Sequence, residues 1–128
     1  MNKGDDIPEL KVTPDKYLPH RYAGASGDFN PIHVDPEFAK QVGLPQNILH
    51  GLYTMAQVAR ANTAAAGGDP RALRRLSVQF RGMGLPEKEI TVTGKVKEIA
   101  DDGKVVVETQ AAQDGNGIVR NAEAELEV

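Results

Sequence analysis

The sequence predicts one α+β domain, residues 1–128, with its helices in the first half of the chain and an antiparallel sheet in the second. Three observations carry this prediction. Apolar residues recur at helical spacing up to residue 66, they alternate with polar residues from Arg74 onward, and turn-forming residues separate the alternating runs. Helices followed by strands favour a sheet that packs one face against a helical layer.

The first elements are expected to be short. The segment ELKV, residues 9–12, has the composition of a short strand. Thr13 and Pro14 then provide a cap and a first-turn proline for a helix that ends near Tyr22. Pro19 lies inside this segment, so the helix is expected to be short or kinked.

The next two helices have clearer boundaries. Asp35 caps the helix PEFAKQV, residues 36–42, and Gly43 ends it. A connecting loop, GLPQNILHG, leads to a longer helix over residues 52–66, which spans ~22 Å. The expected core face of this longer helix consists of small and apolar side chains: Leu52, Met55, Ala56, Ala59 and Ala66.

Four strands are expected after the long helix. Three of them show apolar residues at every second position: Leu76, Val78 and Phe80; Ile90, Val92 and Val96; and Ala122, Ala124, Leu126 and Val128. The run KVVVETQAA, between the turn sequences DDG and DGNG, supplies the remaining strand. Such a sheet leaves open edges, and dimerisation is a common way to cover them.

The composition excludes several classes of function. A net charge of -3 is too small to indicate a nucleic-acid-binding protein. The absence of cysteine excludes disulfides, thiolate metal sites and cysteine nucleophiles. No segment has the ~20 apolar residues of a membrane span, and the N-terminus lacks the apolar core of a signal peptide, so we expect a cytoplasmic protein.

The stretch SGDFNPIHVD gathers polar groups without apolar periodicity. Gly27 and Pro31 both interrupt regular structure, and we therefore expect an irregular loop. This loop would carry three polar side chains, those of Asp28, Asn30 and His33. An acid beside an imidazole suits proton transfer at a carbon next to a carbonyl group, with water added or lost one carbon further out.

The candidate residues can divide this chemistry. Histidine exchanges protons close to neutral pH, whereas aspartate does so only when burial or a partner assists it, so Asp28 and His33 together supply an acid and a base. Asn30 is expected to orient water or a catalytic group. Gly51 lies where the long helix begins, and its free backbone N–H is expected to bind a carbonyl oxygen as an oxyanion hole.

A metal site is the competing interpretation of the same residues. A metal-dependent hydrolase would draw its ligands from a set of acids and imidazoles: His20, Asp28, His33, Asp35 and His50. The sequence contains neither an HxxxH nor an HExxH motif, and we therefore expect no metal.

Residues outside the loop are candidates for substrate contact. Tyr22, Tyr53 and Met55 are expected to line an acyl channel, although core packing is the more common role of such residues. Four arginines could contact the phosphates of coenzyme A or the acidic surface of an acyl carrier protein, although solvated surface is their more common role: Arg71, Arg74, Arg75 and Arg81.

The segments YAGASGDFNPIHVDPEFA and GLPQNILHG, taken together, resemble the signature of MaoC-like dehydratases and R-specific enoyl-thioester hydratases. The resemblance runs from about residue 4 to the C-terminus and is strongest between Tyr22 and Gly51. It implies the hot-dog fold, in which a curved antiparallel sheet wraps a long central helix. It also implies the reversible hydration of a trans-2-enoyl thioester of coenzyme A or acyl carrier protein to its (3R)-3-hydroxyacyl thioester, without a cofactor.

The same resemblance assigns roles to individual residues. Asp28 and His33 jointly hold the reacting water, Asn30 supports them, and Gly51 forms the oxyanion hole.

Two departures from the family pattern favour an alternative. Pro19 lies in the helix before the motif, and Ala59 stands where some relatives have a serine. The first expectation is a homodimeric enzyme. The alternative is a thioester-binding subunit that is active only in a heteromer with a different hot-dog chain.

Overall fold

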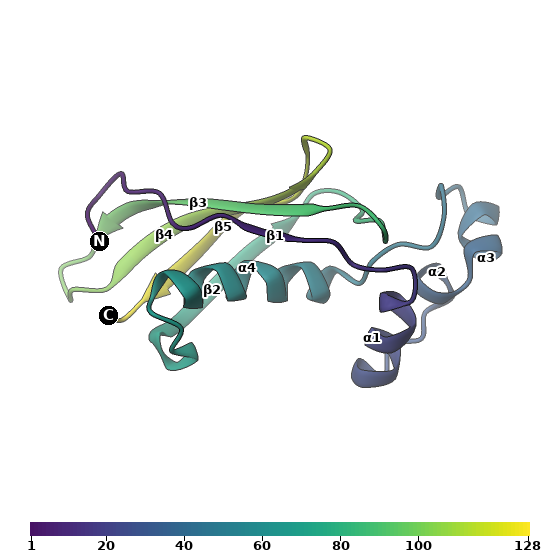
Figure 1. Cartoon of the computed structure of the whole chain (residues 1–128), viewed down its shortest axis with the longest axis horizontal. Coiled ribbons are helices and arrows are strands. Elements are labelled where there is room, and N and C mark those ends of the chain that lie inside the picture. Colours follow the sequence, from purple (N-terminus) through teal and green to yellow (C-terminus); the bar gives the residue numbers. More distant parts are fainter.

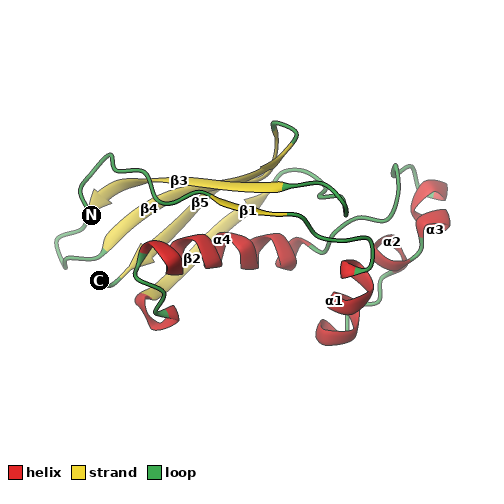
Figure 2. Cartoon of the chain, viewed as in Figure 1, coloured by secondary structure: helices red, strands yellow, loops and turns green.

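Five antiparallel strands form one sheet in the order β1-β3-β4-β5-β2, and the long helix α4 lies along one face of it (Figures 1 and 2). The computed structural model describes residues 1–128. The helices are α1 (Leu18–Ser26), α2 (Pro31–Val34), α3 (Pro36–Gln41) and α4 (Gly51–Ala65), and a short 3-10 turn covers Pro70–Ala72. The strands are β1 (Leu10–Val12), β2 (Leu73–Phe80), β3 (Ile90–Ile99), β4 (Val105–Gln113) and β5 (Asn116–Leu126).

The alternating segments form the strands that the sequence predicts. Strand β4 pairs with a strand on each side: Val107 lies opposite Val96 on β3 and opposite Ala124 on β5. The β1 strand pairs with the sheet edge at β3, with Leu10 opposite Val92. Irregular register interrupts three of the four pairings, which is a source of curvature in antiparallel sheets. The α+β prediction is therefore confirmed, in the hot-dog arrangement that the resemblance implied.

The expected helix start at Thr13 and Pro14 is wrong. Helix α1 begins at Leu18, and Pro19 lies in its first turn, where its missing N–H and fixed φ are compatible with a helix. Pro14 is held outside the helix because its carbonyl accepts a hydrogen bond from the Glu87 N–H at 2.6 Å. Pro19 therefore does not kink the helix.

The predicted core face of α4 is wrong except at its end, where Ala66 packs against the core. Leu52 is 62% exposed, whereas the side of α4 that faces the sheet is partly polar: Tyr53, Thr54, Gln57, Val58, Ala61 and Asn62. Asn62 is fully buried, and its Nδ2 donates to the Val58 carbonyl at 2.9 Å and to Thr109 Oγ1 at 3.2 Å. These hydrogen bonds offset the cost of burying the Asn62 Nδ2 group, whereas the buried Oδ1 of the same amide has no partner.

The core lies between α4 and the sheet and depends on side chains from every strand after β2. Leu126 is fully buried at the end of β5, opposite both Leu73 and Val105. Leu126→Ala is therefore expected to lower the free energy of unfolding by about 2–5 kcal/mol. Chemical denaturation measures this change, and Val128→Ala is a matched control, because Val128 is 68% exposed. Equal effects of the two substitutions would contradict this description of the core.

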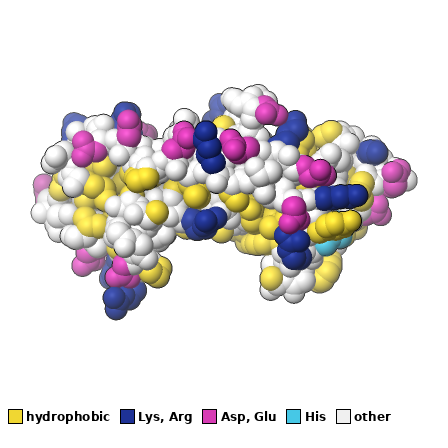
Figure 3. All heavy atoms as spheres, viewed as in Figure 1, with side chains coloured by type: hydrophobic (Ala, Val, Ile, Leu, Met, Phe, Trp, Pro, Cys, Tyr) yellow, Lys and Arg dark blue, Asp and Glu magenta, His cyan; other side chains and the backbone are white.

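None of the helices combines the length and the apolar character that a membrane-spanning helix requires. Charged side chains of both signs are interspersed over the face shown in Figure 3, and part of a histidine is visible near the end that carries α1 to α3.

Candidate active site

The polar stretch is more regular than the sequence predicts. Asn30 caps α2, because its side-chain oxygen accepts from the Ile32 N–H at 3.2 Å. His33 therefore lies on a short helix, while Asp28 and Asn30 precede it in the loop after α1. Asp35 caps α3 as predicted, by accepting from the N–H groups of its second and third following residues. These two caps explain how a polar segment folds back tightly enough to hold a site.

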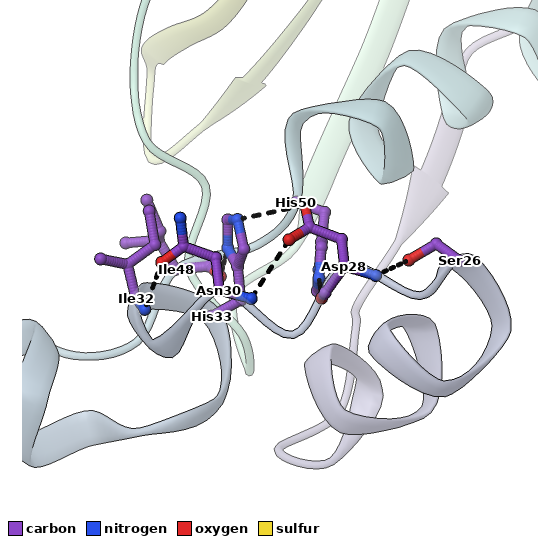
Figure 4. Close-up of polar contacts among 7 residues, drawn as sticks. All are labelled: Ser26, Asp28, Asn30, Ile32, His33, Ile48 and His50. Atoms are coloured by element: carbon purple, nitrogen blue, oxygen red, sulfur yellow. Dashed lines mark hydrogen bonds and ion pairs between the residues drawn. The ribbon is translucent and has the colours of Figure 1, made fainter.

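Asp28 and His33 face each other, as Figure 4 shows. Asp28 Oδ2 lies 3.9 Å from His33 Nε2, and one water molecule can hydrogen bond to both atoms at ~2.8 Å. His33 is 9% exposed, while the Asp28 carboxylate is open to solvent on one side. The Asn30 N–H donates to Asp28 Oδ1 at 3.2 Å, which fixes the second carboxylate oxygen.

The orientation of the His33 ring is set by its other nitrogen. His33 Nδ1 lies 2.8 Å from the Ile48 carbonyl, which can only accept, so Nδ1 carries the proton. In the neutral ring Nε2 then presents its lone pair toward Asp28. The Asn47 side chain holds the same segment in place, because its Nδ2 donates to the His33 carbonyl at 2.9 Å.

His50 is the main residue of the site that the sequence reasoning considered only as a metal ligand and not as part of the acid–base site. It is 3% exposed, and its ring stacks on that of His33 with centroids 4.0 Å apart and an interplanar angle of 21°. His50 Nε2 donates to the Asp28 carbonyl at 2.9 Å, while its buried Nδ1 has no partner. His50 thus contacts both residues of the candidate pair. The only sequence signal was its position immediately before Gly51.

The proposed set of metal ligands is brought together only in part. One ligand atom each from Asp28, His33 and His50 lie within 4.8 Å of one another. His20 instead lies against the Val34 carbonyl, and Asp35 is occupied as a cap. Stacked imidazole rings present their in-plane lone pairs side by side, whereas ligands of one tetrahedral ion must converge on it. The geometry suits proton transfer better than metal binding.

A cavity of about 150 Å³ opens beside His33, between the start of α4 and the end of β2, and Asp28 is not part of its lining. Its lining includes His33, Gly51 and Thr54 on one side and Phe80, Met83 and Ile118 on the other. The N–H of Gly51 belongs to the first turn of α4, where the helix provides no acceptor for it. A Cβ on Gly51 would lie 3.1 Å from the Phe80 ring, so the glycine keeps this side of the cavity open.

The predicted substrate-binding aromatic residues lie elsewhere. Tyr22 packs against His50 at 4.6 Å between ring centroids and makes an edge contact with Tyr53 at 6.0 Å. Burial raises the pKa of the Tyr53 hydroxyl. Met55 is half-buried on α4. None of the three lines the cavity described above, so their contact with substrate stays a prediction.

Comparisons with known proteins identify similar sequences and similar folds. The family model for the MaoC like domain matches residues 3–116. A solved structure of a MaoC-like dehydratase superposes with a TM-score of 0.93 and is 31% identical, covering 99% of this chain and 40% of that one. A chain from the ChsH1-ChsH2 complex of Mycobacterium tuberculosis superposes with a TM-score of 0.86 at 25% identity, covering 98% and 97% of the two chains.

Curated relatives are mostly much longer proteins. A fatty acid synthase beta subunit from Dothistroma septosporum is 37% identical over 84% of this chain, but the match covers only 6% of that subunit. The peroxisomal enoyl-CoA hydratase 2 of Arabidopsis thaliana is 42% identical over 56% of this chain and 23% of its own length. The chain thus corresponds to a small part of these relatives.

Proposed function

Because the chain belongs to the MaoC-like domain family, whose members of known structure include dehydratases and hydratases, we propose that it reversibly hydrates trans-2-enoyl thioesters to (3R)-3-hydroxyacyl thioesters. One observation carries this proposal: an acid and an imidazole lie 3.9 Å apart, and the imidazole lines a cavity that also reaches the N-terminus of α4. Residues 1–128 are proposed to act as one such domain.

In the hydration direction, Asp28 and His33 hold one water molecule between them. The water oxygen forms a bond to C3 of the enoyl group as the pair takes up a water proton. The electrons of the C2=C3 bond move to the thioester oxygen, and a proton from the pair then reaches C2. Dehydration follows the same steps in reverse, and the two side chains are assigned these proton transfers jointly.

The oxyanion hole is assigned to Gly51. Negative charge develops on the thioester oxygen when the bond to C3 forms, and a fixed N–H at a helix start stabilises such charge. The Gly51 N–H occupies this position beside the cavity, with the helix dipole of α4 behind it.

The proposal for the substrate names a class of acyl carrier and a range of chain length. The Arabidopsis relative is named for enoyl-CoA and the Dothistroma relative for fatty acid synthesis, which together suggest fatty acyl thioesters of coenzyme A or acyl carrier protein. A cavity of about 150 Å³ suits a short acyl group. Localisation in the cytoplasm stays a prediction.

A homodimer is proposed as the working form. The outer strands of the sheet, β1 and β2, each leave one side unpaired. Phe80 lines the cavity and is nevertheless 51% exposed, so a second copy packed against it would cover this ring. The heteromeric alternative has weaker support, because Pro19 does not disturb α1.

One assay tests the function and the assembly together. Purified chain is mixed with enoyl-CoA esters of increasing length, loss of the enoyl absorbance is followed, and the mass in solution is measured by light scattering. Turnover by a homodimer supports the proposal. An inactive chain that gains activity only with a second hot-dog subunit would establish the heteromer instead, and inactivity in both settings would refute the assignment.

His50 is proposed as a positioning residue, which gives a separate prediction. His50→Phe keeps a flat ring beside His33 but removes the hydrogen bond to the Asp28 carbonyl, so kcat is expected to fall about 5- to 10-fold with little change in KM. His50→Gln retains a donor and should keep more of the activity. A fall in thermal stability with unchanged kcat would mean that His50 serves packing alone.

A further inference from the structure

A second groove, of about 410 Å³, adjoins the cavity of the candidate active site. Gly82, Met83 and Ile118 line both, so the two spaces share a wall at the end of β2. The groove then runs between the loop after β2 and the hairpin that joins β4 to β5. A substrate whose reactive end fills the cavity can therefore extend its remaining length along this groove.

The groove is basic in a protein whose net charge is negative. Arg81, Lys88 and Arg120 line it, whereas Asp114 is its one acidic residue, and that carboxylate is paired with Lys88 at 3.0 Å. The chain as a whole has 15 lysines and arginines against 18 acids. The excess positive charge is thus confined to the groove next to the candidate active site.

The two guanidinium groups of the groove lack carboxylate partners. Four of the seven arginines form ion pairs with acids elsewhere on the surface: Arg21, Arg71, Arg74 and Arg75. Arg81 instead donates twice to Gln79 Oε1, at 3.1 and 2.7 Å, and Arg120 forms no ion pair. Two of the three arginines without an acidic partner therefore face one groove.

We propose that Arg81 and Arg120 form a binding site for a phosphate group on the carrier of the thioester. Guanidinium groups bind phosphate oxygens through paired, charge-assisted hydrogen bonds, and they do so most effectively when no carboxylate competes. The inference rests on the proposed function, because that function places the acyl end of the bound carrier in the adjoining cavity. Coenzyme A and the phosphopantetheine arm of a carrier protein both present such phosphates.

The test compares substrates with and without phosphate. Arg120→Glu and Arg81→Glu are each expected to raise KM for crotonyl-CoA by about 10-fold or more, while KM for crotonyl-pantetheine, which has no phosphate, stays unchanged. Crotonyl-phosphopantetheine separates the sources. A raised KM for this compound assigns the site to the phosphate next to the pantetheine, and a rise for crotonyl-CoA alone assigns it to the nucleotide phosphates.

Arg74→Glu is the matched control. It makes the same change of charge on the same strand, but Arg74 lies near the opposite end of β2, ~20 Å away, and its ion pair with Glu127 is exposed. Equal changes of KM for the phosphorylated and unphosphorylated substrates, or equal effects of Arg74→Glu, would overturn the proposal.

A binding measurement tests the phosphate site independently of the proposed reaction. The affinity for coenzyme A alone, measured by calorimetry, should fall in Arg120→Glu and not in Arg74→Glu, whether or not the chain turns over an enoyl thioester. If the unmodified chain does not turn over enoyl thioesters, the proposed function is contradicted. If coenzyme A binds to Arg81→Glu and Arg120→Glu as tightly as to the unmodified chain, the phosphate site is contradicted.

Discussion

Asp28→Asn and His33→Ala are each expected to lower kcat for a short enoyl-CoA by about 100-fold or more, because each removes one of the two groups proposed to exchange protons with the reacting water. The asparagine variant keeps the shape of the side chain and its contact with the Asn30 N–H. A loss of activity in this variant would therefore come from the missing carboxylate and not from a change of structure. Initial rates at saturating substrate, with circular dichroism of each variant, measure the effect.

Asp35 offers a matched control on the same segment. Asp35→Asn makes the same change of an acid to an amide, but Asp35 caps α3 and asparagine caps helices equally well. Its activity and stability are expected to remain close to those of the unmodified chain. If Asp28→Asn and Asp35→Asn proved equally active, the carboxylate of Asp28 would have no part in the reaction.

Gly51→Pro is expected to lower kcat by about 10²- to 10³-fold, as the loss of one oxyanion-hole donor does in other enzymes. Proline removes the N–H of Gly51 while remaining compatible with the first position of a helix. The preceding residue, His50, has φ -64° and ψ 133°, a conformation that the residue before a proline readily adopts. The backbone can therefore accept this substitution.

Gly51→Ala separates the lost donor from the added bulk. Alanine keeps the N–H and places a Cβ 3.1 Å from the Phe80 ring, which is half-exposed and can shift. Its main expected effect is a higher KM, because the cavity becomes smaller. Steady-state kinetics of the two variants decide the question, and a proline variant as active as the alanine variant would remove Gly51 from the oxyanion hole.

The parts of the fold that could be predicted depend on local patterns. Alternation along the chain is enough to identify strands such as β3 and β5, because each has one buried face. The start of α1 could not be predicted, since the contact that holds Pro14 in a loop comes from Glu87, far along the chain. The buried face of α4 was also missed, because its many alanines fit either a core or a surface.

In the candidate site too, the residues that are close in the sequence could be predicted, and those brought in by distant contacts could not. Asp28 and His33 could be paired from the sequence because one short stretch carries both. His50 lies seventeen residues after His33, and only the folding of the α2–α3 segment against the start of α4 brings the two rings into contact. The capping role of Asn30 and the place of Phe80 and Met83 on the cavity wall likewise arise from contacts between elements.

The buried bond between Asn62 and Thr109 has a consequence for the far end of α4. Both sides of this helix carry apolar residues, so hydrophobicity alone leaves its rotation about its own axis poorly determined. Rotation of the helix about its axis would break the hydrogen bond from Asn62 Nδ2 to Thr109 Oγ1 and leave the buried Thr109 hydroxyl without this partner, which costs roughly 1–3 kcal/mol. This contact therefore fixes the rotation of α4 and with it the direction of the Gly51 N–H, which lies about 16 Å away along the helix and is proposed to bind the thioester oxygen.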